Sequence, residues 1–227
     1  MKTILFQGDS ITDCGRKRND SSNIFVKLYH AVKKSTPMGN GYPALVADAL
    51  TKSNPDEYRF VNRGVGGDRI PDVYARIVKD IIKVKPDYMS LLVGVNDVWH
   101  GFDWNNGTGT KRFEKVYNIF LEEIKQELPD TRLIILAPFV LPGNATNDRP
   151  DEPGRYKKFR AEVEEIASIE KALAEKHGIK FVELQSVFDE AAKTTPAAEL
   201  LSDGVHPTAK GHELIMKQWL KAFNEIK

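Results

Sequence analysis

The chain has 227 residues, of which 41% are hydrophobic and 29% are charged, a balance that is typical of globular proteins and excludes a disordered chain. Its 33 basic and 32 acidic residues nearly cancel, so nothing predicts binding to nucleic acid or to an anionic membrane surface. Cys14 is the only cysteine, which excludes an internal disulfide and argues strongly against a structural zinc cluster.

Short apolar runs alternate with longer segments in which apolar residues recur every three or four positions. This alternation predicts an α/β fold, a three-layer α/β/α sandwich around a five-stranded parallel sheet. In chain order, strands are predicted over residues 3–7, 58–62, 88–93, 132–137 and 180–183. Helices are predicted over residues 43–52, 70–83, 112–128, 159–177 and 208–223.

The length predicts a single domain over residues 1–227, because one hydrophobic core can keep growing up to roughly 250 residues. The first apolar run, residues 4–6, is shorter than the h-region of a signal peptide, and no stretch reaches transmembrane length. Together with the single cysteine, this predicts a cytoplasmic protein.

Two predicted connections are unusually long. Residues 10–41 are polar and include a short predicted helix over 24–34, whereas residues 142–155 are rich in Pro, Gly, Asn and Asp. Both follow predicted strands, and open α/β sheets bind their ligands at the carboxyl ends of the strands. We therefore expect both connections to form walls of a pocket, with His30 at the surface or at its rim.

A serine follows the first predicted strand directly, in the run Gly8-Asp9-Ser10. This position favours an exposed nucleophile at the edge of the sheet, although Asp and Ser are also common in turns and helix caps. Cys14 is a rival nucleophile, since a thiolate beside a histidine also attacks acyl groups. Ser10 is favoured because Cys14 lies four residues farther along the chain.

A serine nucleophile needs a histidine base that a carboxylate orients. His177 and His212 lie in predicted helices without a D-x-x-H pattern, and we expect them at the surface or in caps. Two D-x-x-H pairs remain, Asp97 with His100 and Asp203 with His206, and their spacing alone does not separate them. The second pair is favoured because it lies in a loop marked by Gly and Pro before the last helix.

Two further strand exits offer hydrogen-bond donors. The run 62–68, with the sequence NRGVGGD, resembles a dinucleotide-binding loop, but Arg69 stands where that pattern requires glycine. Such a glycine-rich turn can instead present a free backbone N–H, and Asn96 adds an amide side chain after the third strand, although either could be simple turn chemistry. A nucleophile, a base and donors at one sheet edge together predict an ester hydrolase.

These segments, G-D-S at 8–10, N-x-G-x-x-G-D at 62–68, G-x-N-D at 94–97 and D-x-x-H-P at 203–207, resemble in order the four blocks of the SGNH hydrolases, also called GDSL esterases. The resemblance spans residues 8–206 and implies that family's flavodoxin-like fold. It also implies a role for each matching residue: a triad of Ser10, Asp203 and His206; an oxyanion hole of the Ser10 N–H, the Gly67 N–H and Asn96; supporting contacts from Asp9 and Asp97; and a pocket-lining His100.

The longer runs around Ser10 and Asn96 resemble an intracellular branch that includes acetylxylan esterases acting on short xylo-oligosaccharides. This implies hydrolysis of acetyl or other short-chain esters on such sugars, without a metal or cofactor. Some members form ring-like oligomers, so a homo-oligomer is one possibility for this chain. The 10–41 connection is longer than we expect for this branch.

Aromatic residues near strand ends could stack on a sugar. Trp99 and Trp104 are expected at the rim of the pocket, and Phe139 is either a sugar platform or a core residue. Two alternative functions remain: a lysophospholipase or thioesterase of the same superfamily, and a catalytically silent α/β binding module.

Overall fold

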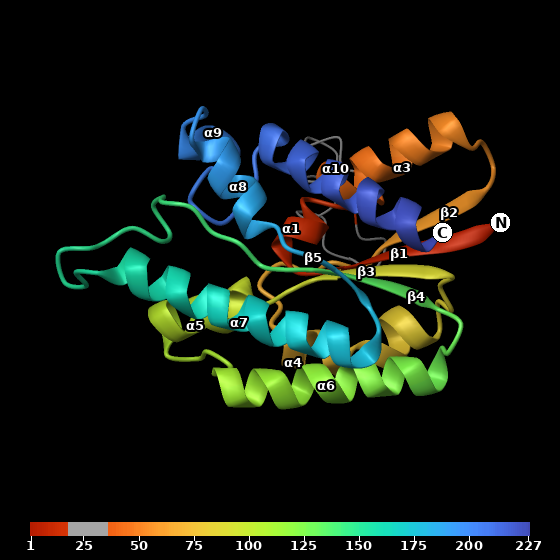
Figure 1. Ribbon diagram of the computed structural model, residues 1–227, viewed down its shortest axis with the longest axis horizontal. Helices are drawn as coiled ribbons and strands as arrows, with labels where there is room; N and C mark the ends of the chain where they lie inside the picture. Colours follow the sequence, from red (N-terminus) through yellow and green to blue (C-terminus); the bar gives the residue numbers. More distant parts are fainter. Residues whose placement is uncertain (18–35) are drawn as a thin grey trace, which may run out of the picture.

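A five-stranded parallel sheet forms the centre of the molecule, in the order β2-β1-β3-β4-β5 (Figure 1). This computed structural model describes residues 1–17 and 36–227. The strands are β1 (Lys2–Gly8), β2 (Tyr58–Asn62), β3 (Tyr88–Leu92), β4 (Arg132–Leu136) and β5 (Lys180–Val182). The order is that of flavodoxin-like folds, so the predicted fold class is confirmed. The helix predicted over 24–34 and His30 lie outside the described residues.

The central strands are apolar because helices cover the sheet on both faces. In β1, Leu5 pairs with Val61 of β2 on one side and with Met89 of β3 on the other. Leu5 and Met89 are at most 1% exposed. All five strands begin and end within two residues of their predicted bounds.

The helices form two layers (Figure 1). One face of the sheet carries α3 (Tyr42–Ser53), α8 (Gln185–Ala192), α9 (Ala197–Leu200) and α10 (Ala209–Ile226). The other face carries α4 (Ile70–Ala75), the π-helical turn η1 (Val78–Ile82), α5 (Val95–Trp104), α6 (Thr110–Glu127) and α7 (Arg155–His177). A short helix, α1 (Ser10–Asp13), follows β1.

The helix predicted over 70–83 is in fact two pieces, α4 and η1. The break lies at Arg76, whose guanidinium pairs with both Asp68 and Asp80. The sequence pattern also missed α1, α5, α8 and α9. For α5 the reason is composition, since Asn, Asp, His, Trp and Gly are weaker helix formers than Ala or Leu, and the packing of the helix outweighs that preference.

Aromatic side chains fill the layer between the sheet and α10. Trp219 of α10 is fully buried, and its ring centroid lies 4.9 Å from that of Phe223 and 5.4 Å from that of Phe6 in β1. This packing fixes α10, and with it the loop that precedes it, against the sheet. Within residues 1–17 and 36–227, no helix combines the length and the apolar character that crossing a membrane requires.

Candidate active site

Ser10 stands at the carboxyl end of β1, as the first residue of α1. Gly8 makes the tight exit from the strand: its φ is +156°, and a Cβ there would lie 2.2 Å from the Leu92 carbonyl oxygen. Only glycine fits such a position. The Asp9 carboxylate then caps α1 by accepting a hydrogen bond from the Ile11 N–H at 2.9 Å. The local sequence therefore places the serine at the open edge of the sheet.

The Ser10 hydroxyl meets the His206 imidazole, although 196 positions separate the two residues. Ser10 Oγ lies 2.9 Å from His206 Nε2, and His206 Nδ1 lies 2.7 Å from Asp203 Oδ2. Asp203 Oδ1 accepts hydrogen bonds from the backbone N–H groups of Val205 and His206, at 2.9 and 2.8 Å. With its Nδ1 proton held by Asp203, His206 has Nε2 free to accept the serine proton.

The electrostatics of this pair favour a stronger base. Burial alone would raise the pKa of Asp203, but the hydrogen bonds from the His206 ring and from two backbone N–H groups outweigh it and hold that pKa at about 2. The bond to Asp203 in turn raises the pKa of His206 above its usual value, against an opposing effect of burial. Asp203 therefore stays ionised across the neutral range, and the imidazole binds a proton more tightly than free histidine.

The rival D-x-x-H pair is not assembled. The Asp97 carboxylate accepts hydrogen bonds from the Ile70 N–H at 3.2 Å and from Thr108 Oγ1 at 2.5 Å. His100 packs instead on Trp104, with ring centroids 4.8 Å apart. Both Asp97 and His100 lie on α5, where Asp97 faces the core and is 2% exposed. The structure thus separates two patterns that spacing could not.

Cys14 is paired with a different histidine. Its Sγ lies 3.3 Å from His212 Nε2, while His212 Nδ1 accepts a hydrogen bond from the Tyr42 N–H at 3.1 Å. Burial raises the pKa of the Cys14 thiol and lowers that of His212 to about 4. His212 is not at the surface, because it is 4% exposed between α10 and α3, but its bond to the Tyr42 N–H does cap the N-terminus of α3, as the second half of the expectation had it. His177 does lie near the surface, where it bonds to Asn118 Oδ1 at 3.0 Å.

The glycine-rich turn that carries Gly67 lies beside Ser10, and the Asn96 side chain bonds to the residue that follows Gly67. Gly66 packs beside the serine, since a Cβ there would lie 3.8 Å from Ser10 Cβ, and Gly67 follows with a φ of +83°. Within the described part of the chain, neither the Ser10 N–H nor the Gly67 N–H donates to another protein group. Asn96 is 4% exposed, and its Nδ2 donates one hydrogen to the Asp68 carbonyl at 3.1 Å, which leaves its second hydrogen unassigned.

Asp9 and Asp97 are buried carboxylates that accept hydrogen bonds from neighbouring backbone N–H groups. Asp9 is fully buried and caps α1, and Asp97 joins α5 to the start of α4 and to Thr108. Burial raises the pKa of each to about 7 despite these hydrogen bonds. In residues 1–17 and 36–227, no group of three His, Cys, Asp or Glu side chains is placed to hold a metal ion.

An aromatic wall flanks His206. The Trp99 ring centroid lies 5.7 Å from that of His206, and Trp104 stacks on Trp99 at 6.3 Å. Trp104 is 61% exposed, as expected of a rim residue. Phe139 is a core residue and not a sugar platform, because it is fully buried and stacks on Phe188 at 4.1 Å.

Two contacts of the site escaped the sequence analysis. Asn62, at the end of β2, donates through Nδ2 to the carbonyl oxygens of Thr12 and Met38, at 2.7 and 2.9 Å, and so ties the Ser10 segment to the glycine-rich turn. The 142–155 loop touches the loop of Asp203 and His206 directly, because the Ala145 N–H donates to the Asp203 carbonyl at 2.8 Å. The asparagine in the 62–68 motif could have predicted the contact of Asn62, whereas no sequence pattern pointed to the contact between Ala145 and Asp203.

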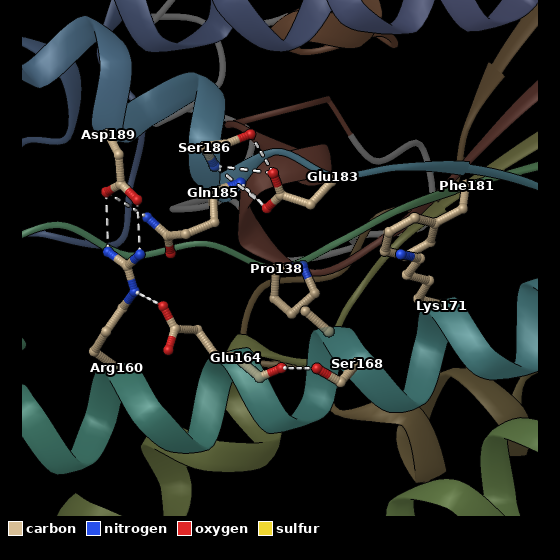
Figure 2. Close-up of a pocket in the computed structure, with 11 residues that line it drawn as sticks. Pro138, Arg160, Glu164, Ser168, Lys171, Phe181, Glu183, Gln185, Ser186 and Asp189 are labelled. Atoms are coloured by element: carbon tan, nitrogen blue, oxygen red, sulfur yellow. Dashed lines mark hydrogen bonds and ion pairs between the residues drawn. The ribbon is translucent and has the colours of Figure 1, made fainter.

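A separate hollow of about 310 Å³ lies between α7 and the segment that joins β5 to α8 (Figure 2). None of the predicted site residues lines it. Three of its charged side chains bind one another: Arg160 donates to Asp189 at 2.7 and 3.0 Å and to Glu164 at 2.6 Å (Figure 2). Arg160, Asp189 and Glu164 are therefore already satisfied by one another.

Comparison with known proteins identifies the family. The sequence pattern of the GDSL-like lipase/acylhydrolase family matches residues 6–214. The chain belongs to this family. It is a carboxylic ester hydrolase. It is 32% identical over 228 residues to an acetylxylan esterase of Geobacillus stearothermophilus, with 96% of this chain and 92% of that protein covered.

Solved structures of relatives show the same fold. The crystal structure of the acetylxylan esterase Axe2 from Geobacillus stearothermophilus superposes with a TM-score of 0.79 at 30% identity, covering 97% of this chain and 93% of that one. A protein of Parabacteroides merdae described as a GDSL-like lipase superposes with a TM-score of 0.80 at 31% identity, covering 98% and 95%. Three Axe2 variants described as catalytic mutants replace a serine, an aspartate and a histidine, the last two of which are three positions apart.

Proposed function

We propose that this esterase uses Ser10, His206 and Asp203 as a catalytic triad and hydrolyses acetyl or other short-chain esters, with O-acetyl groups on xylo-oligosaccharides or related sugars as its substrates. The observation that carries the triad is the contact of 2.9 Å between Ser10 Oγ and His206 Nε2. The catalytic mutants of Axe2 support it, since that enzyme's aspartate and histidine have the same spacing as Asp203 and His206.

The reaction proceeds in two halves. Ser10 Oγ attacks the ester carbonyl carbon while His206 Nε2 takes the hydroxyl proton, and the oxyanion accepts hydrogen bonds from the Ser10 N–H, the Gly67 N–H and Asn96 Nδ2. His206 then gives that proton to the leaving alcohol oxygen, which leaves Ser10 acylated. A water molecule attacks the acyl group with His206 again as base, and the carboxylic acid leaves.

The sugar preference rests on the aromatic wall. The exposed Trp104 presents a ring face beside the site, with Trp99 and His100 behind it. A pyranose ring stacks on such faces, so we assign these three residues to substrate binding. Axe2 is described as an acetyl-xylooligosaccharide esterase, which supports the same substrate class here. With its single cysteine, the protein suits a reducing compartment, and we place it in the cytoplasm.

The test compares acetate release from acetylated xylo-oligosaccharides with hydrolysis of p-nitrophenyl esters of increasing acyl length. We expect activity to fall as the acyl chain lengthens. Activity that rises with acyl length would identify a lysophospholipase or thioesterase instead.

Two variant pairs test the assigned residues. Ser10→Ala should abolish labelling by a fluorophosphonate probe, while Cys14→Ser should leave it intact. His206→Ala should likewise abolish labelling, and His100→Ala should not. Retained labelling in Ser10→Ala or in His206→Ala contradicts the proposed triad.

A further inference from the structure

Arg155 carries a fully buried positive charge next to the site. It begins α7, its side chain is 0% exposed, and its guanidinium lies 5.1 Å from the Phe102 ring and 5.7 Å from the Phe159 ring. Two carboxylates, Asp103 and Glu152, form ion pairs with Arg155, and Asp103 also pairs with Arg149. The cluster therefore contains two positive and two negative charges. A buried ion pair is often no more stable than apolar side chains of equal volume, so stability alone does not account for this arginine.

One side of the guanidinium leads to the catalytic aspartate. Arg155 donates through Nη2 and Nε to the Ala145 carbonyl oxygen, at 3.0 and 3.3 Å. The Ala145 N–H donates to the Asp203 carbonyl at 2.8 Å. Gly143 packs even closer, since a Cβ there would lie 2.3 Å from the Asp203 carbonyl carbon. Arg155 therefore holds the segment on which the backbone of Asp203 rests.

The other side leads to the aromatic wall. Arg155 Nη2 donates to Asp103 Oδ1 at 2.9 Å, and Asp103 Oδ2 accepts a hydrogen bond from Trp99 Nε1 at 2.5 Å. Trp99 in turn packs against His206, with 5.7 Å between ring centroids. Burial alone would raise the pKa of Asp103, but the hydrogen bonds from Arg149 and Trp99 and the charge of Arg155 lower it. Asp103 is thus held as a carboxylate that fixes the indole.

The contacts form a closed ring: His206, Asp203, Ala145, Arg155, Asp103, Trp99 and back to His206. We propose that Arg155 is a positioning residue for the esterase reaction, which holds both the Asp203 backbone and the Trp99 ring in place beside the His206 imidazole. The proposal rests on the proposed triad. Arginine suits this task because its planar fork of donors reaches two acceptors in fixed directions, whereas lysine offers one flexible ammonium.

The test variant is Arg155→Lys, which keeps the charge but loses the fork. We expect kcat for p-nitrophenyl acetate to fall by roughly ten- to a hundredfold, because displacements of about 1 Å cost that much in an oriented site. KM for this small substrate should change little.

The pH profile gives the readout that simple destabilisation would not move. A loosened Asp203 raises the pKa of His206 less, so the acid limb of kcat/KM, which protonation of His206 sets, should lie at lower pH in the variant than in the wild type. Besides Asp203, buried Asp9 and His212 interact with His206 by charge, and the contacts of Arg155 reach neither of them.

The matched control is Arg160→Lys. Arg160 lies on the same helix and also binds two carboxylates, but it faces the separate hollow (Figure 2). We expect this variant to keep kcat within about twofold and its pH profile unchanged, since distant sites act independently. Equal kinetics and pH profiles in the two variants would overturn the proposal.

A double variant separates positioning from folding. If Arg155 acts through Asp203, Arg155→Lys should lower kcat by a much smaller factor in an Asp203→Asn background than in the wild type. If Arg155→Lys lowers kcat by the same factor in both backgrounds, the inference is contradicted. A wild-type enzyme that fluorophosphonate does not label at Ser10 would instead refute the proposed function itself.

If Arg155→Lys does not fold, Asp103→Asn cuts the same ring at a more exposed residue. The amide keeps one acceptor oxygen but loses the charge that faces Arg155. We expect a loss of kcat of roughly tenfold in this variant. A kcat equal to that of Arg160→Lys contradicts the proposal on its own.

Discussion

The Asn96 side chain makes a structural hydrogen bond and, in the proposed mechanism, also binds the oxyanion. Its amide is buried, donates one hydrogen to the Asp68 carbonyl, and lies on α5 at the carboxyl end of β3. Because Asn offers two N–H donors, one can hold the turn while the other binds an oxyanion. The two tasks predict separable effects of one substitution.

Asn96→Ala should lower kcat by roughly a hundred- to a thousandfold, the usual loss for one oxyanion donor. Stability should fall by about 1 kcal/mol, because the Asp68 carbonyl loses its partner. Steady-state kinetics with p-nitrophenyl acetate and urea unfolding measure the two effects. Asn224→Ala, at an exposed position of α10, is the control. A normal kcat in Asn96→Ala would remove this residue from the oxyanion hole.

At the scale of elements, the segment after β4 and the loop before α10 act as one unit. Leu141 N–H donates to the Gly204 carbonyl at 3.0 Å, and Ala145 N–H donates to the Asp203 carbonyl at 2.8 Å. Gly143 allows the two backbones to touch, since a Cβ there would lie 2.3 Å from the Gly204 nitrogen. The 142–155 loop therefore supports the loop that carries Asp203 and His206, in addition to its expected role as a pocket wall.

Gly143→Ala should displace the Asp203 loop, because its methyl group meets backbone rather than a flexible side chain. We expect kcat to fall by roughly ten- to a hundredfold, the cost of misplacing a reacting group by about 1 Å. Gly101→Ala is the control, since a Cβ there finds its nearest neighbour at 3.5 Å, an ordinary contact. If both variants turn over ester at the same rate, the two loops do not depend on this close approach.

At the scale of the whole molecule, the strand order places the site. The chain runs from β1 to β2 on one side and later to β3 on the other, so the connections diverge beyond the carboxyl end of β1. A crevice forms at such a switch point, and Ser10 stands there. Helix α10 completes the site from the opposite end of the sequence, because its packing on the sheet determines where His206 lies.

Trp219→Ala should therefore destabilise the entire protein, by about 3 to 5 kcal/mol, the usual cost of removing a large buried aromatic ring. Trp219→Phe should lower the free energy of unfolding much less, because it keeps a ring against Phe6 and Phe223. It also removes a buried indole N–H that has no hydrogen-bond partner among the described residues. Urea unfolding followed by circular dichroism compares the two. Equal losses in both variants would show that ring packing is not what α10 contributes.

The sequence by itself determined the positions of the five strands and of the turn that presents Ser10 after the first strand. Buried parallel strands are continuous apolar runs, and this local signal placed all five of them, while Gly8 and Asp9 marked the exit that presents Ser10. The prediction of one domain over residues 1–227 stays a prediction.

Only the tertiary structure shows which of the two D-x-x-H pairs has its aspartate bonded to its histidine. Both have the same spacing, but α5 turns Asp97 toward the Ile70 N–H, whereas the loop before α10 lets Asp203 reach the His206 ring. It also placed Phe139 in the core, and it revealed that Arg155 joins both flanks of His206. These are contacts between residues far apart in the chain, and no local pattern encodes which distant partner a side chain will meet.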